Sequence, residues 1–128
     1  MKKLINVPTY LLSLIYLVFG SNYFFHFLAM PPMSGDAGAF AGLLYTTGFL
    51  AVVKTLEVVL AVLLIVPATR ALAALLIAPI SINILLFELL IAHQPGIGIL
   101  LVLLNGFIIY ANREKYFSIV RSTNIGAL

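Results

Sequence analysis

Four long apolar segments, separated by short connections, take up most of this 128-residue chain. Each is close to the roughly 20 residues that an α-helix needs to cross the hydrocarbon core of a bilayer. Hydrophobic residues make up 63% of the sequence and charged residues 9%, whereas a soluble domain averages about 45–50% and about 25%. A membrane-embedded chain is therefore expected. The segments cover approximately residues 9–29, 47–66, 71–92 and 96–112.

The apolar segments predict helices rather than strands. They show no alternation with a period of two, and a helix satisfies its backbone groups without a neighbour. The connections at 66–70 and 93–96 are short, so helices adjacent in sequence should pack antiparallel. We predict one all-α domain over residues 1–128, an antiparallel four-helix transmembrane bundle of a multi-pass membrane protein.

The first connection, residues 30–46, is the longest. It begins with turn and cap residues, including Pro31, Pro32 and Asp36. Apolar residues such as Phe40 and Leu43 then recur at helical spacing. This pattern favours a short interfacial helix after the first span, with an ordered loop as the alternative.

The basic residues lie almost entirely on one side of the predicted membrane. Under a four-span count, the first and third connections carry no Lys or Arg. The positive-inside rule then places both termini in the cytoplasm. The net charge of +3 follows from this bias, so nucleic acid is not expected as a partner, whereas the lipid bilayer is. The residues on the basic side are Lys2, Lys3, Arg70, Arg113, Lys115 and Arg121.

Other chemistry-bearing residues are few. The chain has no cysteine, which removes disulfides and thiolate metal sites, and its two histidines do not form a haem-binding pair. Tyrosines near segment ends, Tyr16 among them, predict an interfacial aromatic belt in part. No metal site and no certain cofactor follow from the sequence.

Lys54 and Glu57 stand out because they lie inside the second apolar segment. Three residues apart on a helix, they share one face. A charge near the bilayer centre costs about 2.5–3.5 kcal/mol on insertion scales, so both should face the bundle interior and pair. Further hydrogen bonds must then satisfy the pair. The candidate members of this polar network on the other spans are Asn22, His26, Asn83, Glu88 and Asn105.

Two interpretations of this network are open. In one, buried polar groups only hold the helices in register. In the other, they line a pocket that binds a polar head, such as a quinone carbonyl or a lipid group, with apolar walls around the tail. A proton or ion path is a third, weaker interpretation.

A stripe of small residues marks the third segment at Ala71, Ala74 and Ala78. Small residues let helix backbones approach closely. The stripe predicts either packing within the chain or a homodimer interface.

The order of several motifs resembles the DoxX family of small four-span membrane proteins. The most specific parts are Lys54-Thr55-Leu56-Glu57 in the second segment and Ala78-Pro79 followed by Asn83 and Phe87 in the third. The resemblance covers roughly residues 12–116. It implies a four-helix bundle in a bacterial cytoplasmic membrane, with Lys54, Glu57, Pro79 and Asn83 at recurring positions. Many members have His where Glu88 stands, which weakens any mechanism that needs a base there.

The resemblance also implies a role beside sulfur- or quinone-linked oxidoreductases, or in membrane assembly. We expect an accessory subunit or a small-ligand binding protein, with quinone as the candidate ligand and a membrane redox protein as the candidate partner. Catalysis by this chain alone is not expected, because it offers no recognisable cofactor ligands. The alternatives are a membrane assembly factor, a structural helix-packing protein and, less favoured, a small transporter.

Overall fold

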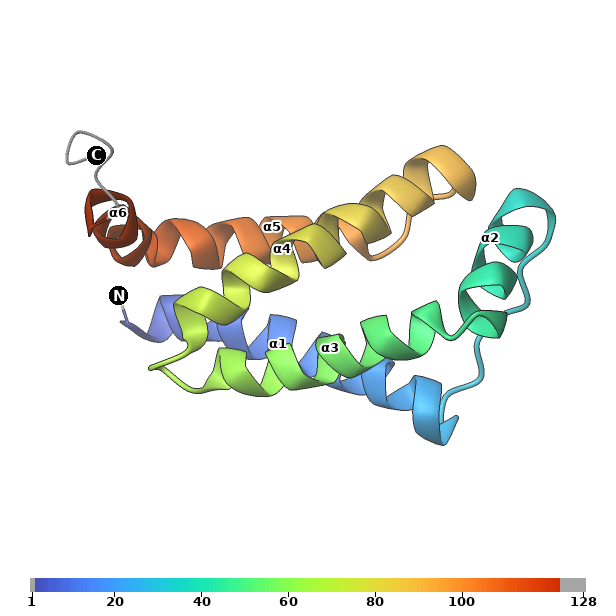
Figure 1. Ribbon diagram of the computed structural model, residues 1–128, viewed down its shortest axis with the longest axis horizontal. Helices are drawn as coiled ribbons and strands as arrows, with labels where there is room; N and C mark the ends of the chain where they lie inside the picture. The colour runs from blue at the N-terminus through green and yellow to red at the C-terminus, as the bar shows by residue number, and fades with distance from the viewer. Residues whose placement is uncertain (1, 123–128) are drawn as a thin grey trace.

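The computed structural model describes the backbone of residues 2–122 and the side chains of residues 6–121. Within that range the protein is all-α, as predicted (Figure 1). Its elements are α1 (Lys2–Phe25), α2 (Gly35–Thr46), α3 (Phe49–Ile65), α4 (Arg70–Leu86), the π-helical turn η1 (Phe87–Ile91), α5 (Gly98–Ala111) and α6 (Arg113–Ser122).

Four of these helices form a bundle. The helix α1 packs on α3 and α5, and α4 packs on α3 and α5, so the four surround one apolar core. Figure 1 shows α1 and α3 in one layer and α4 and α5 in the other. The core consists of Leu12, Tyr16, Leu60, Ala61, Leu64, Ala73, Ala74, Ile77, Leu101 and Ile108.

The lengths of the helices support fewer membrane spans than the four expected. Asn6–Phe25 and Arg70–Ile91 are each long and apolar enough to cross a bilayer. The helices α2 and α3 meet this test only as a pair, and they are bent by 82° at their junction. The helix α5 has 14 residues, about 21 Å at 1.5 Å per residue, against a hydrocarbon core of about 30 Å. The described residues therefore contain two candidate spans, or three if the bent pair is one span.

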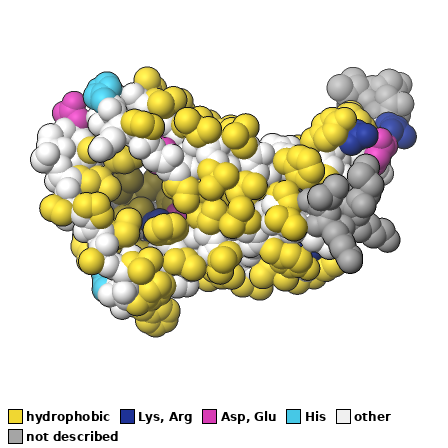
Figure 2. Space-filling view, turned by 180° about the vertical axis from the view of Figure 1, so that it is seen from behind, with side chains coloured by type: hydrophobic (Ala, Val, Ile, Leu, Met, Phe, Trp, Pro, Cys, Tyr) yellow, Lys and Arg dark blue, Asp and Glu magenta, His cyan; other side chains and the backbone are white. Residues whose placement is uncertain are grey.

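The outer surface of the bundle is strongly apolar. Leu14, Val52 and Leu103, on three different helices, are all exposed. Figure 2 shows hydrophobic side chains covering most of one face. Such a surface is stable against lipid and unfavourable in water, which supports contact with a bilayer.

The first helix differs from its predicted bounds. It begins at Lys2 rather than near residue 9, so Pro8 lies inside it. It ends at Phe25 rather than near residue 29, because His26 adopts a left-handed φ of 53°. The Asn22 side chain also makes two hydrogen bonds to the backbone of Leu28, beyond the end of the helix. Asn22 Oδ1 accepts from the Leu28 N–H (2.7 Å), and Asn22 Nδ2 donates to the Leu28 carbonyl (3.2 Å).

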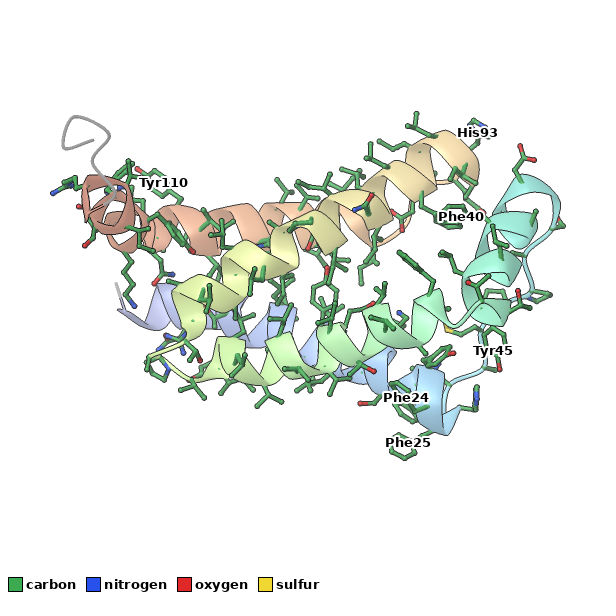
Figure 3. The ribbon with its side chains drawn as sticks, viewed as in Figure 1. Phe24, Phe25, Phe40, Tyr45, His93 and Tyr110 are labelled. Atoms are coloured by element: carbon green, nitrogen blue, oxygen red, sulfur yellow. The ribbon has the colours of Figure 1, made fainter. Side chains whose placement is uncertain are left out.

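The first connection does contain a helix, so the ordered-loop alternative is wrong. The turn from α2 to α3 passes through Gly48 at φ 83°, which a glycine adopts without steric cost. None of the residues of α2 is buried. Aromatic contacts tie it to its neighbours: Tyr45 to Tyr23 of α1 (ring centroids 5.7 Å apart) and Phe40 to Phe87 of η1 (5.5 Å; Figure 3).

Two elements were not predicted. At η1 the backbone hydrogen bonds join residues five apart, as in the bond from the Ala92 N–H to the Phe87 carbonyl (2.8 Å). Such π-helical turns often occur at functional positions. The helix α6 follows α5 after a single residue, Asn112, at which the last predicted helix ends.

Candidate functional site

The ion pair expected from its spacing is present on α3. Lys54 Nζ donates to Glu57 Oε1 at 3.3 Å and lies 3.3 Å from Oε2. The Glu57 side chain is 3% exposed and that of Lys54 is 21% exposed. The carboxylate is thus enclosed by protein, while the ammonium group has one side open.

Close packing of α1 against α3 encloses the carboxylate. A side chain added at the buried Gly20 would meet Val58 Cγ2 at 2.8 Å and Glu57 Cβ at 3.5 Å. Glycine at this position therefore allows α1 to approach the turn of α3 that carries the pair. One helical turn further along α3, the Ser13 hydroxyl donates to the Ala61 carbonyl (2.7 Å) and fixes the same interface.

The open side of Lys54 lies toward a hollow. Figure 2 shows the surface hollowed near the end of the molecule where α2 lies, with a basic side chain visible inside. The other six Lys and Arg residues lie at the opposite end, at the start of α1, at the start of α4 or in α6, which leaves Lys54 as this side chain. Hydrophobic side chains border the hollow in Figure 2, so the site joins one ammonium group to an apolar wall. This is the composition expected of a pocket for an amphipathic molecule.

The structure does not bring the other candidate residues to this pair. Asn22 and His26 terminate α1, as described above, and His26 is exposed. Asn83 is exposed and its Nδ2 donates to the Pro79 carbonyl of its own helix (2.8 Å). The Asn22 and Asn83 side chains thus make local bonds where bonds between helices were expected.

Glu88 has a role that the sequence did not indicate. Its Oε1 accepts the backbone N–H of Gly98 at 2.8 Å, at the start of α5. A carboxylate there satisfies an otherwise unpaired helix N–H and interacts favourably with the helix dipole. Glycines at 96 and 98 make room for it, since a Cβ at either would overlap the Glu88 carboxylate.

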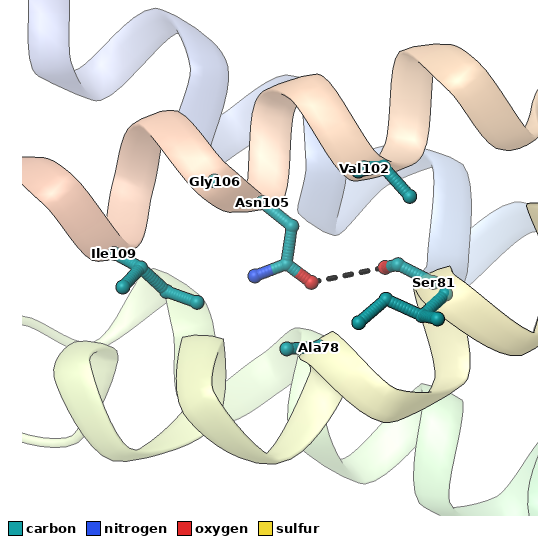
Figure 4. A pocket seen from close by; sticks show the side chains of 7 residues that line it. Ala78, Ser81, Val102, Asn105, Gly106 and Ile109 are labelled. Carbon is teal, nitrogen blue, oxygen red and sulfur yellow. Dashed lines mark hydrogen bonds between the residues drawn. The ribbon is translucent and has the colours of Figure 1, made fainter.

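Asn105 belongs to a second buried network that links three helices. Ser81 Oγ donates to Asn105 Oδ1 (2.9 Å; Figure 4), and Asn105 Nδ2 donates to the Ala74 carbonyl (2.9 Å). Because the Ser81 proton is used in this way, the Tyr16 hydroxyl donates to Ser81 Oγ (2.6 Å). Asn105 is 2% exposed.

Sequence reasoning missed Tyr16 and Ser81. Tyr16 was assigned in part to an interfacial aromatic belt, but it is buried in the core. Its position one helical turn from Gly20, on the face that also carries Leu12 and Ser13, is the signal that could have placed it there. The alanine stripe also faces inward in part, since Ala74 is fully buried within the chain.

Two shallow grooves lie on the surface of the bundle. One, of about 130 Å³, runs between α4 and α5 and is lined by Ala78, Ser81, Ile82, Val102, Asn105, Gly106 and Ile109 (Figure 4). The other, of about 380 Å³, is lined by Ser21, Phe24, Phe25, Thr55, Val58 and Val59. Neither is lined by Lys54 or Glu57. Among the described residues there is no group of three or more His, Asp or Glu side chains that could hold a metal ion.

Comparison of the chain with protein-family models, with curated proteins and with solved structures found no match.

Proposed function

We propose that this chain is a DoxX-like, four-span protein of the bacterial inner membrane that binds a small amphipathic ligand beside Lys54. A quinone is the ligand we favour, and the chain would serve as an accessory subunit of a membrane oxidoreductase. The observation that carries the proposal is the one-sided exposure of the ion pair: Glu57 is enclosed, whereas Lys54 is a fifth exposed toward an apolar hollow.

The chemistry of the pair supports a ligand that accepts hydrogen bonds. An ammonium group has three N–H donors, and Glu57 lies on one side of it. A quinone carbonyl could accept a remaining donor while the ring and tail contact apolar side chains. Glu57 neutralises Lys54, so a neutral head would enter without leaving a net buried charge.

The chain supplies binding and orientation rather than electron transfer. It has no cysteine, and a quinone bound beside Lys54 would exchange electrons with a partner protein. This is the basis for the accessory-subunit role.

The groove between α4 and α5 favours a second candidate, an assembly protein that holds a partner helix. Ala78 and Gly106 line this groove, and a Cβ added at Gly106 would have no atom within 4 Å. A partner helix could therefore approach closely there.

Mass spectrometry of small molecules extracted from protein purified out of native membranes tests ligand binding. We expect a quinone to be retained by the wild type and by Asn83→Leu, whose side chain bonds only within α4, and to be lost from Lys54→Met. A short-chain ubiquinone should raise the melting temperature of the wild type and of Asn83→Leu, but not that of Lys54→Met. Equal retention by Lys54→Met and wild type, or no retained amphiphile and no stabilisation in any variant, would contradict the proposal.

A further inference from the structure

The helix α6 has two chemically distinct faces. From Glu114 onward, at 100° per residue, Tyr116, Phe117, Ile119 and Val120 fall on one side of α6, and Glu114, Lys115, Ser118 and Arg121 on the other. Phe117 is 49% exposed, Ile119 59% and Val120 68%. Phe117, Ile119 and Val120 are thus presented to the surroundings of the bundle rather than to its core.

The bundle holds α6 across its end. Figure 1 shows α6 nearly end-on while α5 runs along the picture, so the chain turns sharply at Asn112. The Tyr116 hydroxyl donates to the Ala71 carbonyl at the start of α4 (2.6 Å). Partial burial raises the pKa of Tyr116 above its ordinary value of 10.0, so the phenol keeps this proton at neutral pH. Arg113 donates to the Tyr110 carbonyl (3.0 Å) and stacks over the Tyr110 ring (4.3 Å).

Positive charge gathers at this end of the protein. Six of the seven basic residues lie in α6, at the start of α1 or at the start of α4, and one acidic residue, Glu114, accompanies them. Glu114 is paired loosely with Arg121, at 3.9 Å. The basic residues are Lys2, Lys3, Arg70, Arg113, Lys115 and Arg121.

We propose that α6 is an interfacial helix that binds anionic lipid headgroups. A helix that lies across the ends of membrane-embedded helices lies along the plane of the membrane surface. There Phe117, Ile119 and Val120 enter the boundary between headgroups and acyl chains, and Lys115 and Arg121 interact with lipid phosphates. The excess of positive charge selects an anionic surface. This inference does not depend on a ligand at Lys54.

The experiment uses the absence of tryptophan from the chain. In Phe117→Trp, the new indole is the one tryptophan and reports the surroundings of α6. The full chain is reconstituted in phosphatidylcholine vesicles, or in mixtures with phosphatidylglycerol, each with brominated acyl chains as quenchers. Phe107→Trp, at an exposed position within α5, is the matched control for a residue already facing lipid.

We expect quenching of the indole in Phe117→Trp by brominated lipid to rise with the phosphatidylglycerol fraction and to fall with salt, while quenching in Phe107→Trp stays constant. Adding Lys115→Gln and Arg121→Gln to Phe117→Trp should move the rise to higher phosphatidylglycerol fractions, since each charge lost weakens attraction about fivefold.

Quenching in Phe117→Trp that is independent of phosphatidylglycerol would overturn the proposal. Access of aqueous acrylamide to the same indole in every membrane would overturn it too. So would shielding of the indole that depends on protein density alone, which is the sign of a second copy on this face.

Discussion

At the scale of single residues, the bundle interior contains two polar clusters that differ in how they are bonded. The Lys54–Glu57 pair is made within one helix and is open on one side. The Tyr16–Ser81–Asn105 network is made between helices and is closed. The first is suited to meeting a ligand and the second to holding helices in register.

Lys54→Met leaves the enclosed Glu57 carboxylate without its cation. Breaking a fully buried pair costs about 3–5 kcal/mol, and because Lys54 is a fifth exposed we expect a loss of about 2–3 kcal/mol in unfolding free energy. The double variant Lys54→Met/Glu57→Gln also removes the unpaired carboxylate and should recover most of the lost unfolding free energy. Denaturation of both proteins in detergent micelles measures the difference; a double variant no more stable than the single one would refute the account.

Two asparagines offer a matched comparison of buried and exposed amides. Asn105→Leu removes the acceptor of Ser81 inside the core, and we expect it to cost about 1–2 kcal/mol. Asn83→Leu removes a bond within α4 at an exposed position and should change stability by less than about 0.5 kcal/mol. Melting temperatures of the two variants check the order. Similar losses would mean that Asn83 also joins helices.

At the scale of elements, the ends of the helices are set by side chains that bond to the backbone. Asn22 ends α1 by bonding to Leu28, and Glu88 satisfies the start of α5 through Gly98. The helix α2 then bridges the open end of the bundle through aromatic contacts to α1 and η1. The hollow beside Lys54 follows from this arrangement.

Gly98→Ala tests the junction of η1 and α5. Its new methyl group would overlap the Glu88 carboxylate and lie 2.8 Å from Leu85 Cα, a backbone atom that cannot move cheaply. We expect a loss of about 1–3 kcal/mol. Gly106→Ala in the same helix has open space around the methyl group and should be neutral or stabilising by up to about 1 kcal/mol. Thermal unfolding distinguishes them, and equal effects would show that the contact at Gly98 relaxes freely.

At the scale of the whole molecule, the arrangement relative to the membrane is the main proposal to test. The lengths of the helices support two or three spans, whereas the four-span topology requires α3, with 17 residues, and α5, with 14, each to cross on its own. The start of α1 and all of α6 lie at one end of the bundle in Figure 1. A chain that crosses the membrane an even number of times has both ends on the same side.

The cysteine-free chain allows this topology to be mapped with single cysteines. Four spans predict that an impermeant maleimide labels Ala39→Cys and Gln94→Cys from outside the cell. Ala68→Cys and Ser118→Cys should react only after the membrane is permeabilised. The natural chain, which has no cysteine, is the control for labelling that does not depend on a thiol. Labelling of positions 94 and 118 from the same side would show that α5 does not cross.

The sequence by itself determined the all-α class, the approximate helices and the ion pair, because these depend on hydropathy and on neighbours three or four residues apart. It could not determine which asparagine faces the core. Asn22, Asn83 and Asn105 are chemically alike, and their roles depend on how each helix is rotated and where it ends. The tertiary structure decided this: it joins Tyr16 to Ser81 across 65 residues and leaves Asn83 outside. Such contacts depend on the packing of whole helix faces, which the local spacing of residues does not specify.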